Sequence, residues 1–506
     1  MKMQSLFRAM VMTGLAPTVM LLAGCQSEDT YQQKRAANAR NDGFFIATRD
    51  VPKGEVFSLP TCIEYALRNN LDLEVYNLRE QISNERKTAA VLGMLPQVNL
   101  SYNLDARSNE PGSSSYNIYT GAQSLTPSKS EEKTSRTFTI DMALSTMDLG
   151  LAYFNSIQAQ DNEWIQNSQR KRTAQELIYN VTKKYCQVAA AQYAIETTAA
   201  LLDRTGQVEN ILDQIQKDRS LSPVRALDEK KRFINLEKRL MQYRTSYDNT
   251  CIELKALMGL QPNRKIKVDT GFLKKMNEIN LPPIDQLEQL ALRERPELRQ
   301  TDIQQHISIV ETRKAIIKMF PNTRIFADYN DYSNKYLYHN RWWSMGLMST
   351  IDLFSIPQQI AEYRTQDAKV KAIEGKTVAL SVSVMSQVRL SYAAILENKR
   401  QYELDNKIFQ AYFEYYQEVR KVYDAGGDYA EIDLDRLDLE TADVSINRAF
   451  SLAGYYLAYY RLINSIGLDS IDPQEMKQKL SNLGPLNTAV PPKVASIVST
   501  PVAAAR

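Results

Sequence analysis

The sequence has 506 residues, with 62 Lys+Arg, 59 Asp+Glu and a formal net charge of +3, and this balance excludes a basic nucleic-acid-binding protein. Glycine and proline number only 18 each and 24% of the residues are charged, which favours long helices with hydrated faces. After the N-terminal segment no stretch has about 18 uninterrupted apolar residues, so we expect no further transmembrane helix. Any later crossing of a membrane would therefore require a closed β-barrel.

The N-terminus has the features of a secretory signal peptide over residues 1–24. Lys2 and Arg8 precede an apolar stretch that is too short and too interrupted for a spanning helix. The stretch ends in Leu-Ala-Gly-Cys at Cys25. This motif resembles the bacterial lipobox, which implies cleavage before the cysteine and acylation of it by diacylglycerol and a further chain such as palmitate. We therefore expect an acylated N-terminal segment over residues 25–58, anchored stably by more than one acyl chain. The alternative is a plain secretory signal with a chance cysteine.

The chain then repeats itself. The segment that begins at Leu59 matches the one that begins at Ile284 at an offset of 225 residues, and later anchors match at offsets of 204 and 208. Periods this long indicate internal duplication of a domain rather than a solenoid. We expect a first repeat over 59–282, a second over 283–468 and a mobile C-terminal tail over 469–506. The fall in the offset places a longer loop in the first copy.

Each copy contains two candidate strands in which apolar and polar residues alternate. They lie at about 97–105 and 136–147 in the first copy, and at about 322–330 and 341–351 in the second. Strands of roughly ten residues with one apolar face suit a membrane barrel with a watery lumen, and they also suit a half-exposed sheet. Phe138 aligns with Trp342, whereas the alternation favours Trp343, so we expect a bulge or a one-residue slip there.

Long helices fill the rest of each copy. We expect one helix from about Thr61 to Met94, a rod over 151–217 and its counterpart as far as Tyr423, because breakers are nearly absent. Both rods turn back into return helices that end near Leu260 and Leu468. Apolar residues at heptad spacing predict helix packing along both rods. They are Ile178, Val181, Tyr185, Val188, Ile195, Ala199 and Leu202 in the first, with Gln192 in a gap, and Ile408, Tyr412, Tyr415, Val419 and Val422 in the second.

The remaining cysteines predict buried thiols. Cys62, Cys186 and Cys251 fit no zinc or redox spacing, and with only two histidines we expect no metal and no cofactor. Cys186 and Cys251 lie at similar distances from the first turn, so a disulfide stays open, although helix phase can forbid the required Cα separation of roughly 4.4 to 6.8 Å. No nucleophile-elbow, zincin, P-loop or dinucleotide-binding motif is found, and we expect no enzyme.

Taken together, these residues resemble the TolC family of outer-membrane efflux channels over almost the whole mature chain. The features that carry the resemblance are Ala-Leu-x-Asn-Asn-Leu from Ala66, Ala-Leu-x-x-x-Pro-Glu-Leu from Ala291, Leu-Pro-Gln-Val-Asn-Leu-Ser-Tyr from Leu95, and Thr-x-Asp-Leu from Thr146 and Thr350. The resemblance implies a mainly α fold with a small β part. It implies a homotrimer in which each chain gives four strands to a shared 12-stranded transmembrane β-barrel and long antiparallel helices to a periplasmic α-barrel.

The resemblance also implies where function lies. In the family the periplasmic tips coil inward and carboxylates ring the closed entrance, and the matching stretch here starts at Gly426. Asp433 falls on the first gate aspartate, whereas the second falls on Arg436. Asp435 or Asp438 could substitute, Arg436 could form a salt bridge that holds the gate shut, or these acids could merely complement the helix dipole. The expected adaptor-docking tips are Ser220, Leu221, Ser222, Pro223, Gly426, Gly427 and Asp428.

The function that follows is an exit duct of a tripartite efflux or type I secretion system. Its expected partners are a periplasmic adaptor, an inner-membrane efflux pump or ABC transporter, and outer-membrane lipid. We expect it in the outer membrane, lipid-anchored and extending into the periplasm, and Gln26 agrees with outer-membrane sorting. The alternative is a lipid-anchored periplasmic coiled-coil scaffold without a pore.

Overall fold

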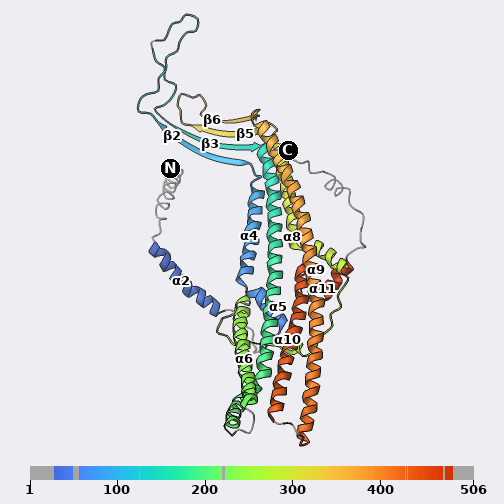
Figure 1. Cartoon of the computed structure of the whole chain (residues 1–506). Helices are drawn as coiled ribbons and strands as arrows, with labels where there is room; N and C mark the ends of the chain where they lie inside the picture. Colours follow the sequence, from blue (N-terminus) through green and yellow to red (C-terminus); the bar gives the residue numbers. More distant parts are fainter. Residues whose placement is uncertain are drawn as a thin grey trace, which may run out of the picture. The chain divides into compact units, whose positions relative to one another are not determined.

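The structure is a computed structural model that describes residues 28–48, 56–124, 126–218, 223–427, 429, 431–470 and 473–482 (Figure 1). Cys25, Ser220, Leu221, Ser222 and Asp428 lie outside the described residues. The chain is mainly helical with a small β part. It divides into two compact units. The first unit falls within Met1–Leu71, Asn180–Asn277 and Gln401–Leu457, and the second within Asp72–Tyr179, Glu278–Arg400 and Ala458–Arg506.

A four-stranded antiparallel sheet lies in the second unit. Its strands are β2 (Gln97–Ala106), β3 (Thr134–Ser145), β5 (Asn322–Tyr332) and β6 (Arg341–Thr350), in the order β2-β3-β5-β6 (Figure 1). These bounds cover the ranges that alternation predicts almost entirely. In the described part of the chain, the outer edges of β2 and β6 pair with no further strand.

The register gives the sheet one apolar and one polar face. Residues paired across all four strands share a face, because neighbouring residues of a strand point to opposite sides. One such row is Leu100, Ile140, Tyr329 and Trp343, and the adjacent row on the other face is Asn99, Asp141, Asp328 and Ser344. Large side chains of the apolar face are exposed: Val98, Leu100, Leu104, Met142, Ile325, Trp343, Met345 and Leu347.

The pairing of β6 with β5 is unbroken from Arg341 to Thr350, so the bulge that we considered for this strand does not form. Trp343 lies on the apolar face opposite Tyr329, with ring centroids 5.1 Å apart. Trp342 lies on the other face opposite Asn330. The mismatch in the repeat is therefore a one-residue slip of the alignment and not a kink of the strand.

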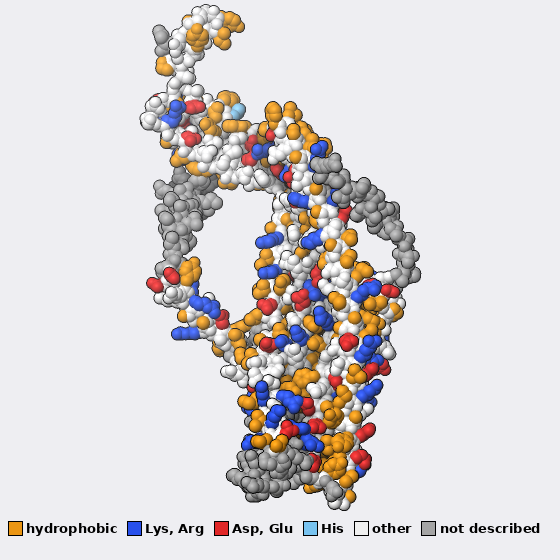
Figure 2. All heavy atoms as spheres, viewed as in Figure 1, with side chains coloured by type: hydrophobic (Ala, Val, Ile, Leu, Met, Phe, Trp, Pro, Cys, Tyr) orange, Lys and Arg blue, Asp and Glu red, His pale blue; other side chains and the backbone are white. Residues whose placement is uncertain are grey.

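The loops at the far ends of the two hairpins differ in length. Residues 107–133 join β2 to β3 and project beyond the sheet as a second, irregular hairpin, whereas residues 333–340 join β5 to β6 directly (Figure 1). Hydrophobic side chains gather at the end of the longer loop (Figure 2). A longer loop in the first copy is what the fall in the repeat offset predicts.

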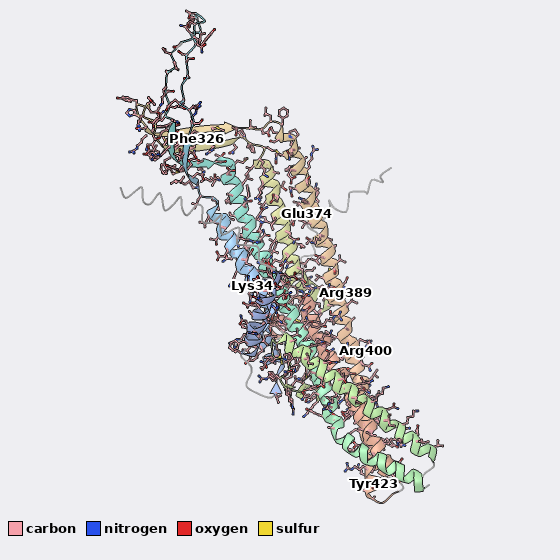
Figure 3. The ribbon with its side chains drawn as sticks, turned by 90° about the vertical axis from the view of Figure 1, so that its left-hand side faces the viewer. Lys34, Phe326, Glu374, Arg389, Arg400 and Tyr423 are labelled. Atoms are coloured by element: carbon pink, nitrogen blue, oxygen red, sulfur yellow. The ribbon has the colours of Figure 1, made fainter. Side chains whose placement is uncertain are left out.

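On the polar face, an aromatic ring covers a glycine. Phe326 of β5 is paired with Gly346 of β6, and a Cβ built on Gly346 would lie 2.4 Å from the Phe326 ring (Figure 3). No side chain fits at Gly346 without displacing Phe326. Glycine at position 346 therefore allows the Phe326 ring to lie over the backbone of β6.

Helices make up the rest of the second unit. They are α4 (Leu71–Leu92), α7 (Ile284–Glu294), α8 (Pro296–Ile317), α11 (Pro473–Ser481) and the sheet-proximal parts of α5 (Thr146–Asp218) and α9 (Ser355–Asp424). Polar contacts attach α9 to α7 and α8. Glu374 accepts from Gln305 at 2.8 Å, and Arg389 binds Glu288, whose side chain is 7% exposed (Figure 3). Among the described helices only α9 has the length and composition of a membrane-spanning helix, and just 22% of its apolar window is buried.

The first unit contains α2 (Glu28–Ala47), α3 (Leu59–Asn69), α6 (Pro223–Leu257), the short η1 (Gly271–Leu273), most of α10 (Glu431–Ile466) and the remaining parts of α5 and α9. Two short strands, β1 (Val56–Phe57) and β4 (Lys267–Val268), pair in parallel and are not predicted by the alternation. The Tyr185 hydroxyl lies 3.2 Å from the Phe57 carbonyl and 3.1 Å from that of Asp269, which fixes these strands to α5. The core around them is fully buried and includes Phe57, Leu254, Met258 and Leu273.

Two expectations from the sequence need correction, and the alternative of a disulfide that it left open is decided. The helix predicted from Thr61 to Met94 is two helices, because Asn70 is extended (φ −70°, ψ 123°) and its side chain donates to the Leu257 carbonyl at 3.2 Å. The predicted tail contains a helix, α11, whose Met476 is buried and whose Lys479 lies 2.9 Å from Glu294. Cys62, Cys186 and Cys251 are free and buried, so the possible disulfide does not form.

Candidate functional site

The turn between α9 and α10 contains the two glycines that the sequence places at one tip. Gly426 has a φ of +81°, and its N–H bonds to the Tyr423 carbonyl at 2.9 Å. The Gly427 N–H bonds to the Val422 carbonyl at 2.9 Å, and a Cβ on Gly427 would lie 2.6 Å from the Val422 side chain. This is the glycine-dependent way to end a helix with a left-handed residue. The turn of the first copy lies outside the described residues apart from Pro223, which begins α6.

The four candidate gate residues lie together at the start of α10, in its first two turns. Asp433 and Arg436 form an ion pair of 3.7 Å one turn apart, and their side chains are 16% and 30% exposed. Asp435 and Asp438 lie on the same short stretch and are half-buried. Acidic side chains near a helix N-terminus stabilise the positive end of its dipole. The pairing of Asp433 with Arg436 is within one helix, so within a single chain it does not join α10 to another element.

Ion pairs that do join two helices lie one to two turns further along and were missed by the sequence analysis. Arg232 of α6 lies 3.3 Å from Glu440 of α10, and Arg239 is paired with Asp443. These four residues, with Arg436, line a cavity of about 260 Å³ between the two return helices. The sequence did contain a signal for one of these pairs. The repeat offset of 208 that aligns Gly259 with Gly467 also places Arg232 and Glu440 at equivalent positions of the two return helices.

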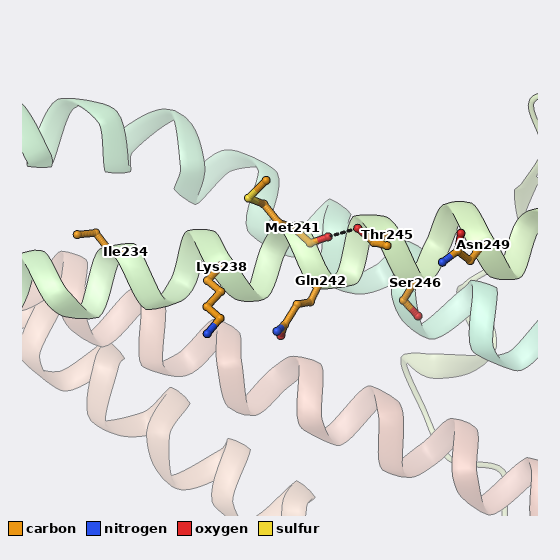
Figure 4. A pocket seen from close by; sticks show the side chains of 7 residues that line it. All are labelled: Ile234, Lys238, Met241, Gln242, Thr245, Ser246 and Asn249. Carbon is orange, nitrogen blue, oxygen red and sulfur yellow. Dashed lines mark hydrogen bonds between the residues drawn. The ribbon is translucent and has the colours of Figure 1, made fainter.

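A shallow groove of about 730 Å³ runs along one face of α6 (Figure 4). All seven residues that line it come from this helix: Ile234, Lys238, Met241, Gln242, Thr245, Ser246 and Asn249. Ile234 is 51% exposed and Met241 67%. Thr245 bonds back to the Met241 carbonyl at 2.9 Å. The described part of the chain therefore leaves this face of α6 uncovered.

The packing seam predicted on α9 is also largely uncovered. Of its five residues only Val419 is buried, whereas Ile408, Tyr412, Tyr415 and Val422 are between 36% and 50% exposed. A row of apolar side chains at heptad spacing is the usual contact surface for another helix.

The described residues hold no group of three or more His, Cys, Asp or Glu side chains that could bind a metal ion. Burial raises the pKa of the Cys62 and Cys186 thiols to about 12. These thiols are therefore protonated and poor nucleophiles or metal ligands near neutral pH.

Comparison with known proteins gives a match in structure only: no family model matches the chain, and no curated protein matches it. The CmeC outer membrane channel of Campylobacter jejuni is 14% identical with a TM-score of 0.62, over 84% of this chain and 90% of that one. The outer membrane protein VceC of Vibrio cholerae is 14% identical with a TM-score of 0.62, over 81% of this chain and 96% of that one. The MtrE outer membrane channel of Neisseria gonorrhoeae, solved in an open state, is 17% identical with a TM-score of 0.60, over 81% and 89%. The fold of this chain is thus the fold of the outer-membrane channels of the TolC family, as the sequence resemblance predicts.

Proposed function

We propose that the protein is a trimeric outer-membrane exit duct that passively conducts substrates delivered by an inner-membrane pump and a periplasmic adaptor. The observation that carries this proposal is the four-stranded sheet, which exposes apolar side chains on one face and polar ones on the other, and whose two edges pair with no strand among the described residues. An exposed apolar sheet face is costly in water and favourable against lipid.

Four strands cannot close a barrel by themselves, since single-chain membrane barrels start at about eight strands. Pairing the free edge of β2 with the β6 edge of a neighbouring copy removes both edges. Three copies then give a barrel of 12 strands, each chain contributing the four in the sheet. The polar rows that contain Asn99 and Asp141 would face the lumen of that barrel.

The helices support the same assembly. The seam of α9 is a largely apolar helix face, and the groove on α6 is a mixed face with exposed Ile234 and Met241; the described chain leaves most of both uncovered. Neighbouring copies would cover them and close a periplasmic α-barrel, the helical counterpart of the strand pairing. The matched element lengths of the two halves, 11 and 22 residues for α3 and α4 as for α7 and α8, agree with an internal duplication.

The two turns are the proposed docking tips and the start of α10 is the proposed gate. The sequence contains no nucleotide-binding motif, so the duct needs an energy source elsewhere, which a pump reached through an adaptor would supply. The Gly426–Gly427 turn and the first-copy turn at Pro223 differ in sequence, so a trimer would offer two kinds of groove in alternation. Asp433 and Arg436 would line the entrance between three copies of α10.

Cys25 is the proposed lipid anchor, which would hold the chain to the outer membrane beside the barrel. Cys25→Ser should abolish incorporation of a labelled fatty acid and block processing at the lipobox. Wild-type protein that takes up no lipid label would remove the anchor from the proposal and leave the duct intact.

The central test uses the purified full chain in planar lipid bilayers and on mild-detergent gels. A duct should give stepwise conductance and migrate as a trimer that heating converts to monomers. A coiled-coil scaffold would stay bound to membranes without conductance, and that result would favour the alternative over the duct.

The gate assignment has a test of its own. Asp433→Ala should change the resting conductance and weaken its block by divalent cations, because three carboxylates near one axis attract cations. Asp424→Ala, at an exposed position before the turn, is the matched control and should change neither. Unchanged conductance and unchanged block in Asp433→Ala would rule out the gate and leave the duct.

A further inference from the structure

The loop of residues 107–133 folds as a hairpin of its own. The proposed duct would conduct without it, so the hairpin calls for a separate explanation. Its two arms exchange backbone bonds between Ser113 and Ser128, at 3.0 and 2.8 Å. The base is fixed to the other loop of the sheet, because the Asn334 side chain is 4% exposed and donates to the Ser130 carbonyl at 3.0 Å. Lys335 lies 3.1 Å from Glu132 and adds a second link.

The tip of this hairpin is held in one conformation. The Asn117 side-chain oxygen accepts from the backbone N–H groups of Tyr119 and Thr120 at 2.9 and 3.2 Å, and the Asn117 backbone N–H donates to the Ala122 carbonyl at 2.9 Å. Gly121 supplies the left-handed residue of the turn, with a φ of +68°. A turn held in this way presents its outermost side chains in a fixed arrangement.

Those outermost side chains are apolar and almost fully exposed. Ile118 is 88% exposed and Tyr119 is 98% exposed, and Tyr116 follows at 66%. Residues 111–128 contain no Asp, Glu, Lys or Arg in a chain that is 24% charged. The loop becomes charged again only in its stem, where Lys129 binds Glu110 and Arg107 lies 3.9 Å from Glu131.

We propose that the tips of three copies of this hairpin meet over the outer mouth of the barrel and cap it. The proposal rests on the trimeric duct proposed above. Contact about a symmetry axis brings identical residues together, so any charge at the tip would face its own copies and repel them. A tip without charge and with exposed Ile118 and Tyr119 suits such a contact.

The hairpin is long enough for its tip to reach the axis of the proposed barrel. Twelve strands spaced by about 4.8 Å and tilted by about 40° give a barrel radius of roughly 12 Å. Ile118 is twelve residues beyond Ala106, the end of β2, which allows an extension of at most about 40 Å. The shorter loop of residues 333–340 serves as a base for the hairpin through Asn334 and Lys335.

The test is disulfide-length crosslinking of Ile118→Cys in the purified full-length protein. The three cysteines in the described chain are buried and the fourth, Cys25, is the proposed acylation site, so a short bismaleimide should react at the new thiol alone. We expect covalent dimers on a denaturing gel, with the third copy left as a singly modified monomer, because each chain offers one thiol and the reagent joins two. Asn109→Cys, at an exposed position of the stem, is the matched control and should label without crosslinking. Tyr119→Cys is a second variant at the tip and should behave like Ile118→Cys.

A trimer on the mild-detergent gel whose Ile118→Cys and Tyr119→Cys tips label but do not crosslink would overturn the cap and leave the duct. Absence of a trimer in the wild type would overturn the duct itself. As a functional readout, Tyr119→Asp should raise single-channel conductance severalfold, because three new carboxylates would push the tips apart. Asn109→Asp should leave the conductance unchanged, and equal conductance in both variants would also overturn the cap.

Discussion

The two long helices, α5 and α9, carry similar heptad seams, but the residues of the two seams are buried to different extents in the single chain. On α5 the central seam residues Val181, Tyr185 and Val188 are 2% exposed or less. On α9 the residues Ile408, Tyr412, Tyr415 and Val422 remain at least 36% exposed. The same pattern thus specifies a contact inside the chain in one helix and a free surface in the other. A heptad seam predicts that a helix will be packed, but it does not say whether the partner is in the same chain.

The largest expected effect comes from placing a charged residue in each of the two seams. Val188→Asp places an unpaired carboxylate in the core of the first unit and should cost more than about 4 kcal/mol of folding free energy. Ile408→Asp should leave helix content unchanged and reduce the trimer instead, since its side chain contacts solvent in the single chain. Circular dichroism during heating and mild-detergent gels measure the two effects. Loss of helix content in Ile408→Asp comparable to that in Val188→Asp would contradict the distinction.

Gln192, the polar residue in the buried seam of α5, provides a second test of the difference between α5 and α9. The Gln192 side chain accepts from the Val268 N–H at 2.9 Å and donates to the Val268 carbonyl at 3.2 Å. Gln192→Leu leaves both buried groups without a partner and should cost about 3 kcal/mol. Gln410→Leu, at an exposed position of α9, should cost nothing measurable. Equal melting temperatures of the two variants would show that Gln192 does not hold β4.

A smaller effect should appear as a dependence of stability on pH. Asp161 of α5 is 2% exposed and lies 2.8 Å from His306 of α8. Burial raises the pKa of the Asp161 carboxyl, and the bond to His306 lowers it in part. The folded state therefore binds this proton more tightly than the unfolded state. Its contribution to stability is present below the unfolded pKa of about 3.9 and is lost as pH rises through the raised value.

Asp161→Asn removes this titration, so the variant should lose less stability than wild type as pH rises from about 4 to 7. Thermal melts across that range measure the slope. Asp302 of α8, an exposed residue whose carboxyl pKa is also raised by partial desolvation, provides the control, since Asp302→Asn should leave the Asp161 contribution in place. A wild-type slope retained by Asp161→Asn would contradict the assignment.

The smallest effect is expected where ion pairs join the return helices of the two halves. Arg239→Gln breaks the pair with Asp443, in which the two side chains are 44% and 28% exposed. The cost should stay below about 1 kcal/mol and shrink further at high salt. Arg244→Gln, exposed on the same helix, is the control. A difference between the variants that persists at high salt would mean that Arg239 acts through packing and not through charge.

The sequence by itself determined the elements whose signals are local. Alternation located β2, β3, β5 and β6, the scarcity of breakers predicted α5 and α9, and the glycine pair marked the turn after α9. The quoted motifs, their order and their duplication carried the family resemblance, and that resemblance implied the fold that the solved channels share. These signals are readable because a period of two or of three to four residues, or a left-handed glycine, is a property of neighbouring residues.

Only the tertiary structure decided which residues meet across long separations. It ends α3 at Asn69, where the side chain of the capping residue Asn70 bonds to the Leu257 carbonyl, and it keeps Cys186 and Cys251 as free thiols although both lie at similar sequence distances from the first turn. It pairs Arg239 with Asp443, and it buries Val419 but leaves the other four seam residues of α9 exposed. Each of these outcomes depends on helix phase and on the side chains of distant elements. Periodicity defines the apolar face of an element, whereas its partner is set by how the whole chain packs.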